Sequence, residues 1–388
     1  MRVLKILLAL LLWTVVAVCL ALTIVPHFLD RIYYRGAASS HFDGARFFNP
    51  DGDDERIAAP GGRSRAGFIA RRIFGDSDQP EWPAAVAVRT SKPPARVEGS
   101  AMLATWVGHA TLLVQADGLN ILADPIWSEQ AGPFGFGPRR VAAPGVRFED
   151  LPKIDLILVS HNHYDHMDLA TLRRLWDRDR PMIVTSLGND SVIAQAGVAA
   201  HALDWGQRRA VRPGVGVTVM RNHHWGSRWF RDRNRALWSS FVVTLPGGNF
   251  FFAGDTGLGD GEWPAEAAAL GPIRLAAIPI GAFRFAPGQM SSGSHIGPLE
   301  AVRVWEGLGR PQAIPIHWGT FRLSSEGYDT PPRMLDAAMQ CAGADRSAFA
   351  PIAIGQAVAV PPLGQAAPQS RWEGVERCRR QGVFDRFR

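Results

Sequence analysis

The sequence contains few cysteines, no internal repeat and no signature of an RNA-binding module. Three cysteines do not encode a disulfide framework; Cys341 and Cys378 could pair in an oxidising compartment, but sequence alone does not establish the bond. Without a nucleic-acid signature, the net charge of +6 and the pI near 9.7 fit either an anionic lipid surface or a general preference for arginine. We therefore expect no nucleic-acid partner, and the sequence leaves the oligomeric state open.

Charge is absent from residues 6–25, a run of twenty that follows Arg2 and Lys5. A helix rising ~1.5 Å per residue over this length spans the ~30 Å hydrocarbon core of a bilayer. The alternatives are an uncleaved anchor, a cleaved signal peptide or a hydrophobic tail, and the poor cleavage pattern around Cys19 favours the anchor. We expect residues 1–35 to form a single-pass membrane anchor with the folded domain on the periplasmic or extracytoplasmic side, although arginines beyond the helix offset the charges before it.

The segment Ser160–His166 carries the densest chemistry in the chain, because it places three imidazoles and a carboxylate within six positions. The apolar, β-branched run 154–159 predicts a buried strand directly before it, and leucines with helical spacing predict a helix over 167–176. The cluster should therefore lie at the carboxyl end of a strand, where α/β folds bind ligands. Imidazole and carboxylate are the usual ligands of catalytic zinc. The alternative without a metal is a polar loop in which Asp165 caps the helix that follows.

Other chemistry-bearing residues lie just past short apolar runs in the same way. They are the pair His223–His224, Asp255 and His317. Each alone is more often a core histidine or a turn aspartate than a metal ligand. Because the placement recurs four times along the chain, we expect four loops to converge on one edge of a layered structure.

These motifs resemble those of known hydrolases. The pattern His161-x-His163-x-Asp165-His166, followed by a histidine, by Asp255 and by His317, resembles the metallo-β-lactamase superfamily, which also holds lactonases, thioesterases and nucleases. A narrower resemblance, over about residues 100–340, is to the N-acyl-phosphatidylethanolamine-hydrolysing phospholipase D family and its bacterial relatives. The motifs that carry the narrower resemblance are Thr105–Thr111, Asp124–Ser128, Ser160–His166, Arg231–Asn234, Phe252–Gly257 and His317–Phe321.

The resemblance implies an α/β fold, a four-layer αβ/βα metallo-β-lactamase sandwich preceded by the transmembrane helix. The expected organisation is an anchor at 1–35, a linker or strap at 36–100, a catalytic domain at 101–365 and a basic C-terminal tail at 366–388. The strap segment is rich in glycine, alanine, arginine, proline and aspartate. Apolar residues that could hold it to the domain are Phe47, Phe48, Phe68, Ile69 and Ile73.

The resemblance also implies a di-zinc centre with two Zn²⁺ ions per chain that share a hydroxide. One ion is held by His161, His163 and His224, the other by Asp165, His166 and His317, and Asp255 bridges them. The implied reaction is hydrolysis of a phosphodiester, with Asp165 also counted as catalytic, on an N-acyl-phosphatidylethanolamine-type phospholipid in a membrane, which yields phosphatidic acid and the headgroup alcohol. The alternatives are a lactonase or other carbonyl hydrolase with the same metals, and a metal-binding scaffold with a lapsed site.

Three further histidines have open roles. His295, in a small polar loop before a helix expected near Pro298, is either a surface residue or a catalytic one that binds phosphate or donates a proton to the leaving oxygen. We interpret His109 as structural and His223 as a supporting or exposed residue. Two arginine-containing segments also have two possible roles. Arg139 and Arg140 either bind a phosphate or lie at the surface as ordinary charges. Residues 228–231, in which arginines are interleaved with aromatic residues, form either a patch that faces lipid or an ordinarily packed loop.

Overall fold

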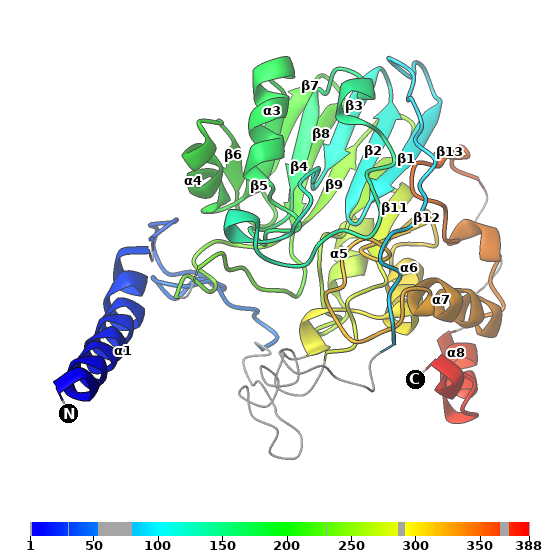
Figure 1. Cartoon of the computed structure of the whole chain (residues 1–388). Helices are drawn as coiled ribbons and strands as arrows, with labels where there is room; N and C mark the ends of the chain where they lie inside the picture. Colours follow the sequence, from blue (N-terminus) through cyan, green and yellow to red (C-terminus); the bar gives the residue numbers. More distant parts are fainter. Residues whose placement is uncertain are drawn as a thin grey trace.

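Two β-sheets with helices on their outer faces make up the folded part of the chain (Figure 1). The computed structural model describes residues 2–29, 31–52, 80–229, 231–285, 292–364 and 372–387. The strands are β1 Met102–Gly108, β2 Thr111–Ala116, β3 Leu119–Ala123, β4 Leu156–Val159, β5 Met182–Ser186, β6 His201–Leu203, β7 Arg208–Arg212, β8 Val215–Met220, β9 Ser240–Thr244, β10 Asn249–Phe252, β11 Ile273–Pro279, β12 Gln312–Ile316 and β13 Ala357–Ala359. The α-helices are α1 Arg2–Leu29, α3 Leu169–Asp179, α4 Asn189–Ile193, α5 Trp263–Ala268, α6 Pro298–Gly307, α7 Thr330–Cys341 and α8 Trp372–Arg380.

Each sheet combines antiparallel and parallel pairings. The first has the order β13-β1-β2-β3-β4-β5-β6, antiparallel up to β3 and parallel from β3 to β6. The second has the order β12-β11-β10-β9-β8-β7, parallel from β12 to β10 and antiparallel beyond. The two sheets therefore bring the carboxyl ends of β4, β8, β10 and β12 into position to carry functional loops.

Alternate residues of each strand belong to different cores. On β4, Leu156 and Leu158 pack in the core between the sheets, whereas Ile157 packs in the core under α3. On β10, Phe250 faces the inter-sheet core and Phe251 the core under α5, α6 and α7. This alternation explains why the strands read as continuous apolar runs, since both faces are covered. The result is the predicted αβ/βα sandwich.

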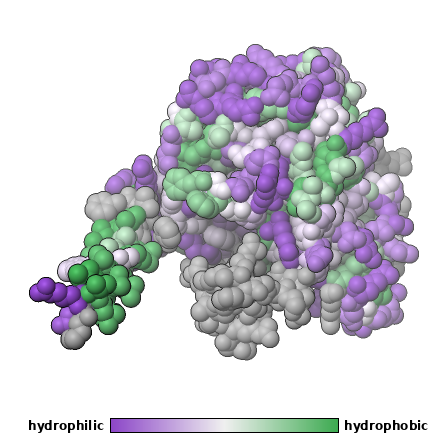
Figure 2. Space-filling view, in the orientation of Figure 1, coloured by the Kyte–Doolittle hydropathy of each residue, from purple (hydrophilic) through white to green (hydrophobic). Residues whose placement is uncertain are grey.

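Helix α1 stands clear of the sandwich (Figure 1), and hydrophobic residues cover it along its length (Figure 2). The apolar side chains of Arg2–Val25 are nearly all exposed, and this stretch is long and apolar enough to cross a bilayer. Thr14 and Thr23 direct their hydroxyls to the carbonyls four residues earlier, so the helix presents little unsatisfied polarity. Length and composition fit a membrane anchor and a signal sequence equally well.

Both described ends of the segment predicted as a strap contact the domain. Phe42 and Phe47 are buried with Trp238 in a small core of their own. At the other end, the Trp82 indole donates to the carbonyl of Glu326, and Arg96 forms an ion pair with Asp155. Phe48 is partly buried. The remaining residues predicted to hold the strap, Phe68, Ile69 and Ile73, lie outside the described residues.

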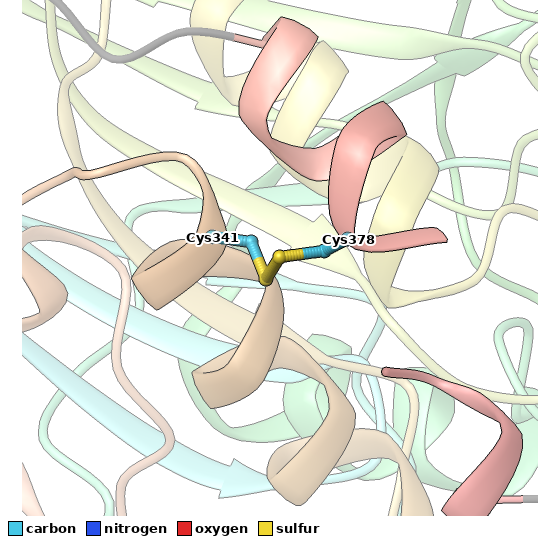
Figure 3. The surroundings of a disulfide bond; sticks show 2 residues. All are labelled: Cys341 and Cys378. Atoms are coloured by element: carbon cyan, nitrogen blue, oxygen red, sulfur yellow. A yellow bond between two sulfur atoms is a disulfide. The ribbon is translucent and has the colours of Figure 1, made fainter. Parts of the chain in front are cut away.

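The C-terminal helix α8 is fastened to the domain. A disulfide joins Cys341, at the end of α7, to Cys378 in α8 (Figure 3). Val375, Phe384 and Phe387 are buried in the same core as α7. The described residues of the segment expected as a basic tail therefore pack against the folded domain. A structural disulfide of this kind is typical of proteins in oxidising compartments.

Candidate metal centre

The four predicted loops meet at one edge of the sandwich. They bring six histidine and aspartate side chains from the ends of β4, β10 and β12, and one from the end of β8, into two adjoining groups of potential metal ligands. The strand ends fix the backbone of each loop, because β4, β8 and β10 are buried over their whole length. The convergence that the sequence predicted is therefore present.

The first group consists of three histidine nitrogens. His163 Nδ1 lies 2.8 Å from His161 Nε2 and 3.4 Å from His224 Nε2. Nitrogens that bind one tetrahedral ion at ~2.0–2.1 Å lie about 3.3 Å from one another. Both distances lie within about 0.5 Å of that spacing, so the three nitrogens could share one metal ion.

The second group surrounds two aspartate oxygens. His166 Nε2 and His317 Nε2 each lie 3.4 Å from Asp165 Oδ2 and 3.1 Å from Asp255 Oδ2. Asp255 Oδ2 also lies 4.0 Å from His224 Nε2, in the first group. One oxygen of Asp255 therefore stands between the two groups, the position that a bridging carboxylate requires.

Backbone and carboxylate oxygens orient the imidazoles. When Nδ1 donates a hydrogen bond, the lone pair of Nε2 is free to face a metal. Three rings are held in this way: His166 Nδ1 donates to Asp124 Oδ2 (2.6 Å), His224 Nδ1 to the carbonyl of Ser294 (2.8 Å) and His317 Nδ1 to the carbonyl of Gly281 (3.1 Å). The tautomer needed for metal binding is thereby fixed in each ring.

Asp124 orients His166, a role that the sequence did not predict for it. It is fully buried at the end of β3 and accepts hydrogen bonds from the amide (2.8 Å) and hydroxyl (2.6 Å) of Ser160, besides the one from His166. The Ser160 hydroxyl also contacts His161 Nδ1 (2.9 Å). Burial raises the pKa of Asp124, and these hydrogen bonds counteract part of that effect. A carboxylate directly after an apolar strand was the sequence signal.

His109, expected to be structural, lies against the candidate ligands. Its Nε2 donates to Asp165 Oδ2 at 2.9 Å, its ring centroid is 4.2 Å from that of His317, and its side chain is buried. Burial lowers its pKa to about 3, so the ring is neutral and acts as a hydrogen-bond donor to the carboxylate. His109 follows β1 just as the other site residues follow their strands, and that placement was the available signal.

His295 lies at the rim of the centre, and His223 does not. His295 Nδ1 is 3.9 Å from Asp255 Oδ2, and its ring is 5.0 Å from that of His224, with the side chain only 8% exposed. This burial disagrees with the interpretation of His295 as a surface residue, and its catalytic role stays a prediction. His223 instead directs Nδ1 to Asp51 at 3.0 Å and is a buried supporting residue.

The charges of the candidate ligands favour the binding of a cation. Burial lowers the pKa of His163 to about 3 and keeps the ring neutral. Burial also acts to lower the pKa of His317, but Asp255 and the hydrogen bond to Asp165 raise it to about 9. Burial opposes ionisation of Asp255, yet His166 and His317 hold its pKa well below the usual range. The carboxylates are therefore ionised and attract positive charge, so a bound cation would displace the protons on the histidines.

Orphaned polar atoms show that the residues fit divalent metal ions. Within the described parts of the chain, His166 Nε2, His317 Nε2 and Asp255 Oδ1 are buried without a hydrogen-bond partner. Buried polar groups are nearly always satisfied, so three exceptions at one point require an explanation. A divalent metal ion held by these residues would satisfy them.

The arginines considered from sequence face away from the centre. Arg140 is buried and donates to the carbonyls of residues 126, 128 and 142, so it supports the backbone and is not placed to bind phosphate. Arg139 is exposed beside Glu129. Arg228 donates to the carbonyls of Asn162 and Met167, and so braces the loop that carries the first three site histidines. Ordinary packing therefore accounts for Arg228.

Comparison with known proteins agrees with this site. A family model described as "Beta-lactamase superfamily domain" matches residues 119–318. The chain is 37% identical over 246 residues to N-acyl-phosphatidylethanolamine-hydrolyzing phospholipase D 1 of Caenorhabditis elegans, covering 60% of this chain and 68% of that protein. It is 30% identical to the mitochondrial N-acyl-phosphatidylethanolamine-hydrolyzing phospholipase D of Saccharomyces cerevisiae, covering 64% of this chain and 54% of that protein.

A solved structure shows the same fold. Igni18, a metallo hydrolase from the archaeon Ignicoccus hospitalis, superposes with a TM-score of 0.51 at 20% identity and covers 68% of this chain and all of its own. The chain belongs to the β-lactamase superfamily and, within it, to the family of the N-acyl-phosphatidylethanolamine-hydrolysing phospholipases D. It is a metallo-hydrolase of the metallo-β-lactamase fold.

Proposed function

We propose that this protein is a di-zinc phosphodiesterase that hydrolyses an N-acyl-phosphatidylethanolamine-type phospholipid. The products are phosphatidic acid and the headgroup alcohol. The observation that carries the proposal is the position of Asp255 Oδ2, 3.1 Å from His166 and His317 and 4.0 Å from His224. One carboxylate oxygen between two ligand groups supports two adjacent metal ions, and two-metal sites are typical of displacement at phosphorus. The names of the nematode and yeast relatives support the substrate class.

The ligand assignment follows the two groups. His161, His163 and His224 would hold one ion, Asp165, His166 and His317 would hold the other, and Asp255 would serve both. When bound, two divalent ions activate water and stabilise the charge that develops on the phosphoryl oxygens. His109 keeps Asp165 directed at its group, and Asp124 does the same for His166. The complete donor set argues against a lapsed scaffold.

His295 is assigned to the substrate side of the centre. It lies close to Asp255 and could form a smaller ligand group with Asp255 and His317, outside the two main groups. Its ring contacts Phe285 at 5.1 Å between centroids. A diester held between the metals would place an oxygen within reach of this imidazole. Burial lowers the pKa of His295 to about 3, so the ring is neutral. We therefore assign its N–H as a hydrogen-bond donor to the leaving oxygen or to a phosphate oxygen, a contribution that for one positioned donor is typically ~10²–10³-fold in rate.

We propose the following organisation and location. Residues 1–35 anchor the chain in a membrane, 36–100 strap the anchor to the domain, 101–365 form the catalytic domain, and 366–388 complete it at the C-terminus. The Cys341–Cys378 disulfide supports a periplasmic or other extracytoplasmic domain, since such bonds persist in oxidising compartments. The exposed apolar surface of α1 supports the anchor.

The experiment uses the full-length protein in phospholipid vesicles. Metal content is measured on the purified protein, and products from N-acyl-phosphatidylethanolamine and from a lactone panel are followed by mass spectrometry. We expect about two metal ions per chain and release of phosphatidic acid. Fully loaded protein that opens lactones and leaves the diester intact would establish a carbonyl hydrolase instead.

His295→Ala tests the role of the rim histidine in the same assay. We expect both metals to stay bound, because His295 belongs to neither main ligand group, while diester turnover falls by about 10²-fold or more. Unchanged diester turnover in this variant would leave the phosphodiesterase proposal standing and exclude His295 from catalysis.

A further inference from the structure

A hairpin between β3 and β4 presents two aromatic side chains to solvent. Its arms are paired through Gln130 and Arg139, and the amide of Ala131 donates to the carbonyl of Pro138 at 3.0 Å. At the tip, Phe134 is 85% exposed and Phe136 is 73% exposed. Two neighbouring phenylalanines this exposed on a soluble surface mark a site of interaction.

The tip has a shape that depends on glycine. A Cβ on Gly132 would lie 1.7 Å from the carbonyl oxygen of Phe136, and one on Gly137 would lie 2.5 Å from the carbonyl oxygen of Ala131. Gly137 also has a φ of 126°, which other residues rarely adopt. Phe134 itself has a φ of 54°, an unfavourable conformation for a bulky residue. The glycines therefore allow a tight turn in which the rings of Phe134 and Phe136 are exposed.

The hairpin contacts two of the loops that carry the metal centre. At its base, Arg140 pairs with Phe321 and the amide of Val141 donates to the carbonyl of Thr320 at 2.8 Å, in the segment that follows His317. At its tip, the Phe134 ring lies 5.9 Å from that of Trp229, in the loop that carries His224. It therefore connects the loops of two site histidines that belong to different ligand groups.

The same face lies next to the exit of α1. The helix ends at Leu29, and Tyr33 is already buried in the domain, with its hydroxyl donating to Asp232 Oδ2 at 2.9 Å. Four residues reach at most ~14 Å. Asp232 also accepts from the amide of Trp229 at 2.9 Å, and Trp229 contacts Phe134. This chain of contacts links the exit of α1 to the loop that contacts the Phe134 tip, so one bilayer can contact both.

We propose that the Phe134–Phe136 tip is a second membrane contact, whose rings enter the headgroup and acyl boundary of the bilayer that holds α1. Aromatic rings suit this boundary, and the neighbouring Arg139, whose side chain is mostly exposed, suits anionic headgroups. With the chain held at α1 and at the tip, the mouth of the metal centre opens onto the lipid surface. The inference rests on the proposed function only in taking α1 as the anchor.

Position-specific fluorescence tests the contact in the full-length chain. Cys19→Ser removes the one free cysteine of the described residues, so Phe134→Cys or Phe136→Cys can carry a single environment-sensitive label. Leu270→Cys is the matched control, because Leu270 is 43% exposed and its carbonyl contacts Asn249, at the start of β10 and far from the site edge. In vesicles, we expect the labels at 134 and 136 to shift to the blue and to be quenched by nitroxide lipids, and the label at 270 to stay in water.

Equal, water-like emission from all three labels would overturn the proposal. So would a blue shift at 134 that requires a high density of protein in the vesicle, because that result would identify a second copy of the chain as the partner.

Activity gives an independent readout. Phe134→Ser/Phe136→Ser should lower turnover of phospholipid in vesicles by about fivefold or more and leave hydrolysis of a short-chain, water-soluble diester unchanged. Leu270→Ser should change neither rate. Equal vesicle turnover in the tip and control variants would contradict the proposal. If the wild-type protein hydrolyses no diester, the proposed function fails, and the fluorescence result still decides whether the tip touches the membrane.

Discussion

The orientation of His166 by Asp124 leads to a quantitative prediction. In Asp124→Asn, an amide oxygen at the position of Oδ2 still accepts from His166 Nδ1 and from the Ser160 hydroxyl, but the amide nitrogen then faces the Ser160 N–H, so that hydrogen bond is lost and the loop that carries His161 and His166 must shift. If the amide nitrogen faces His166, the ring must change tautomer and place a hydrogen on Nε2, where the metal should bind. Either arrangement weakens the same ion.

The expected size follows from the contacts. Asp124 is fully buried and accepts hydrogen bonds of 2.6, 2.6 and 2.8 Å. A hydrogen bond to a charged group contributes about 1.5–3 kcal/mol, which corresponds to roughly 10- to 150-fold in an equilibrium constant. Loss of a residue that orients a metal-bound histidine typically costs about 10–100-fold. We therefore predict metal affinity about 10–100-fold weaker at the ion held by His166, with the ion held by His161 much less affected.

Competition titration with a chromogenic chelator measures both ions separately. Asp168→Asn is the matched control, since Asp168 is a buried carboxylate that caps α3, accepts from the amides of Trp127 and Ser128 and touches no candidate ligand. Asparagine there also loses buried hydrogen bonds, but none of them orients a metal ligand. We expect the control to bind two ions like the wild type. If Asp124→Asn binds both ions within about twofold of the control, the orienting role of Asp124 is refuted.

Three further outcomes are expected. Asp255→Ala should lose both ions or most of the activity, because one oxygen serves both ligand groups; full occupancy and turnover, by metal analysis and product assay, would remove the bridge. Replacing Cys341 and Cys378 by alanine should lower the free energy of unfolding by about 4 kcal/mol in denaturant titration, given a closed loop of 37 residues; an unchanged midpoint would show that the bond adds no stability. A chain that begins at Arg31 should leave the membrane fraction yet keep its metals, since it retains the buried Tyr33; a full-length chain found soluble and lacking residues 1 to about 21 would establish a signal peptide.

The layers and the convergence of the loops could be predicted from the sequence. The strands around β4 and β10 are apolar on both faces, and the site residues stand directly at their carboxyl ends. His161 and His163 are two residues apart on such a loop, so their nitrogens meet without help from distant sequence. Asp255 and His317 then join them because their strands lie together in the second sheet, at β10 and β12.

The supporting contacts could not be predicted, for physical reasons. His224 and His317 are oriented by backbone carbonyls. Every residue has a backbone carbonyl, so the sequence does not indicate which one accepts the hydrogen bond. Asp124 and His109 come from other strand ends, and their partners depend on how the sheets meet. The pairing of Cys341 with Cys378 depends on the packing of α8 against α7. The sequence predicted only a solvated tail or helix for the C-terminal segment, so it did not predict this packing.

Hydrolysis in ¹⁸O-labelled water tests the central claim most directly. The metal-loaded, full-length protein acts on N-acyl-phosphatidylethanolamine in vesicles, and both products are analysed by mass spectrometry. If water attacks phosphorus, the phosphatidic acid carries one ¹⁸O and the headgroup alcohol carries none, and metal removal abolishes both products. Label in the headgroup alcohol, or in a fatty acid released in place of phosphatidic acid, would contradict a metal-dependent phosphodiesterase.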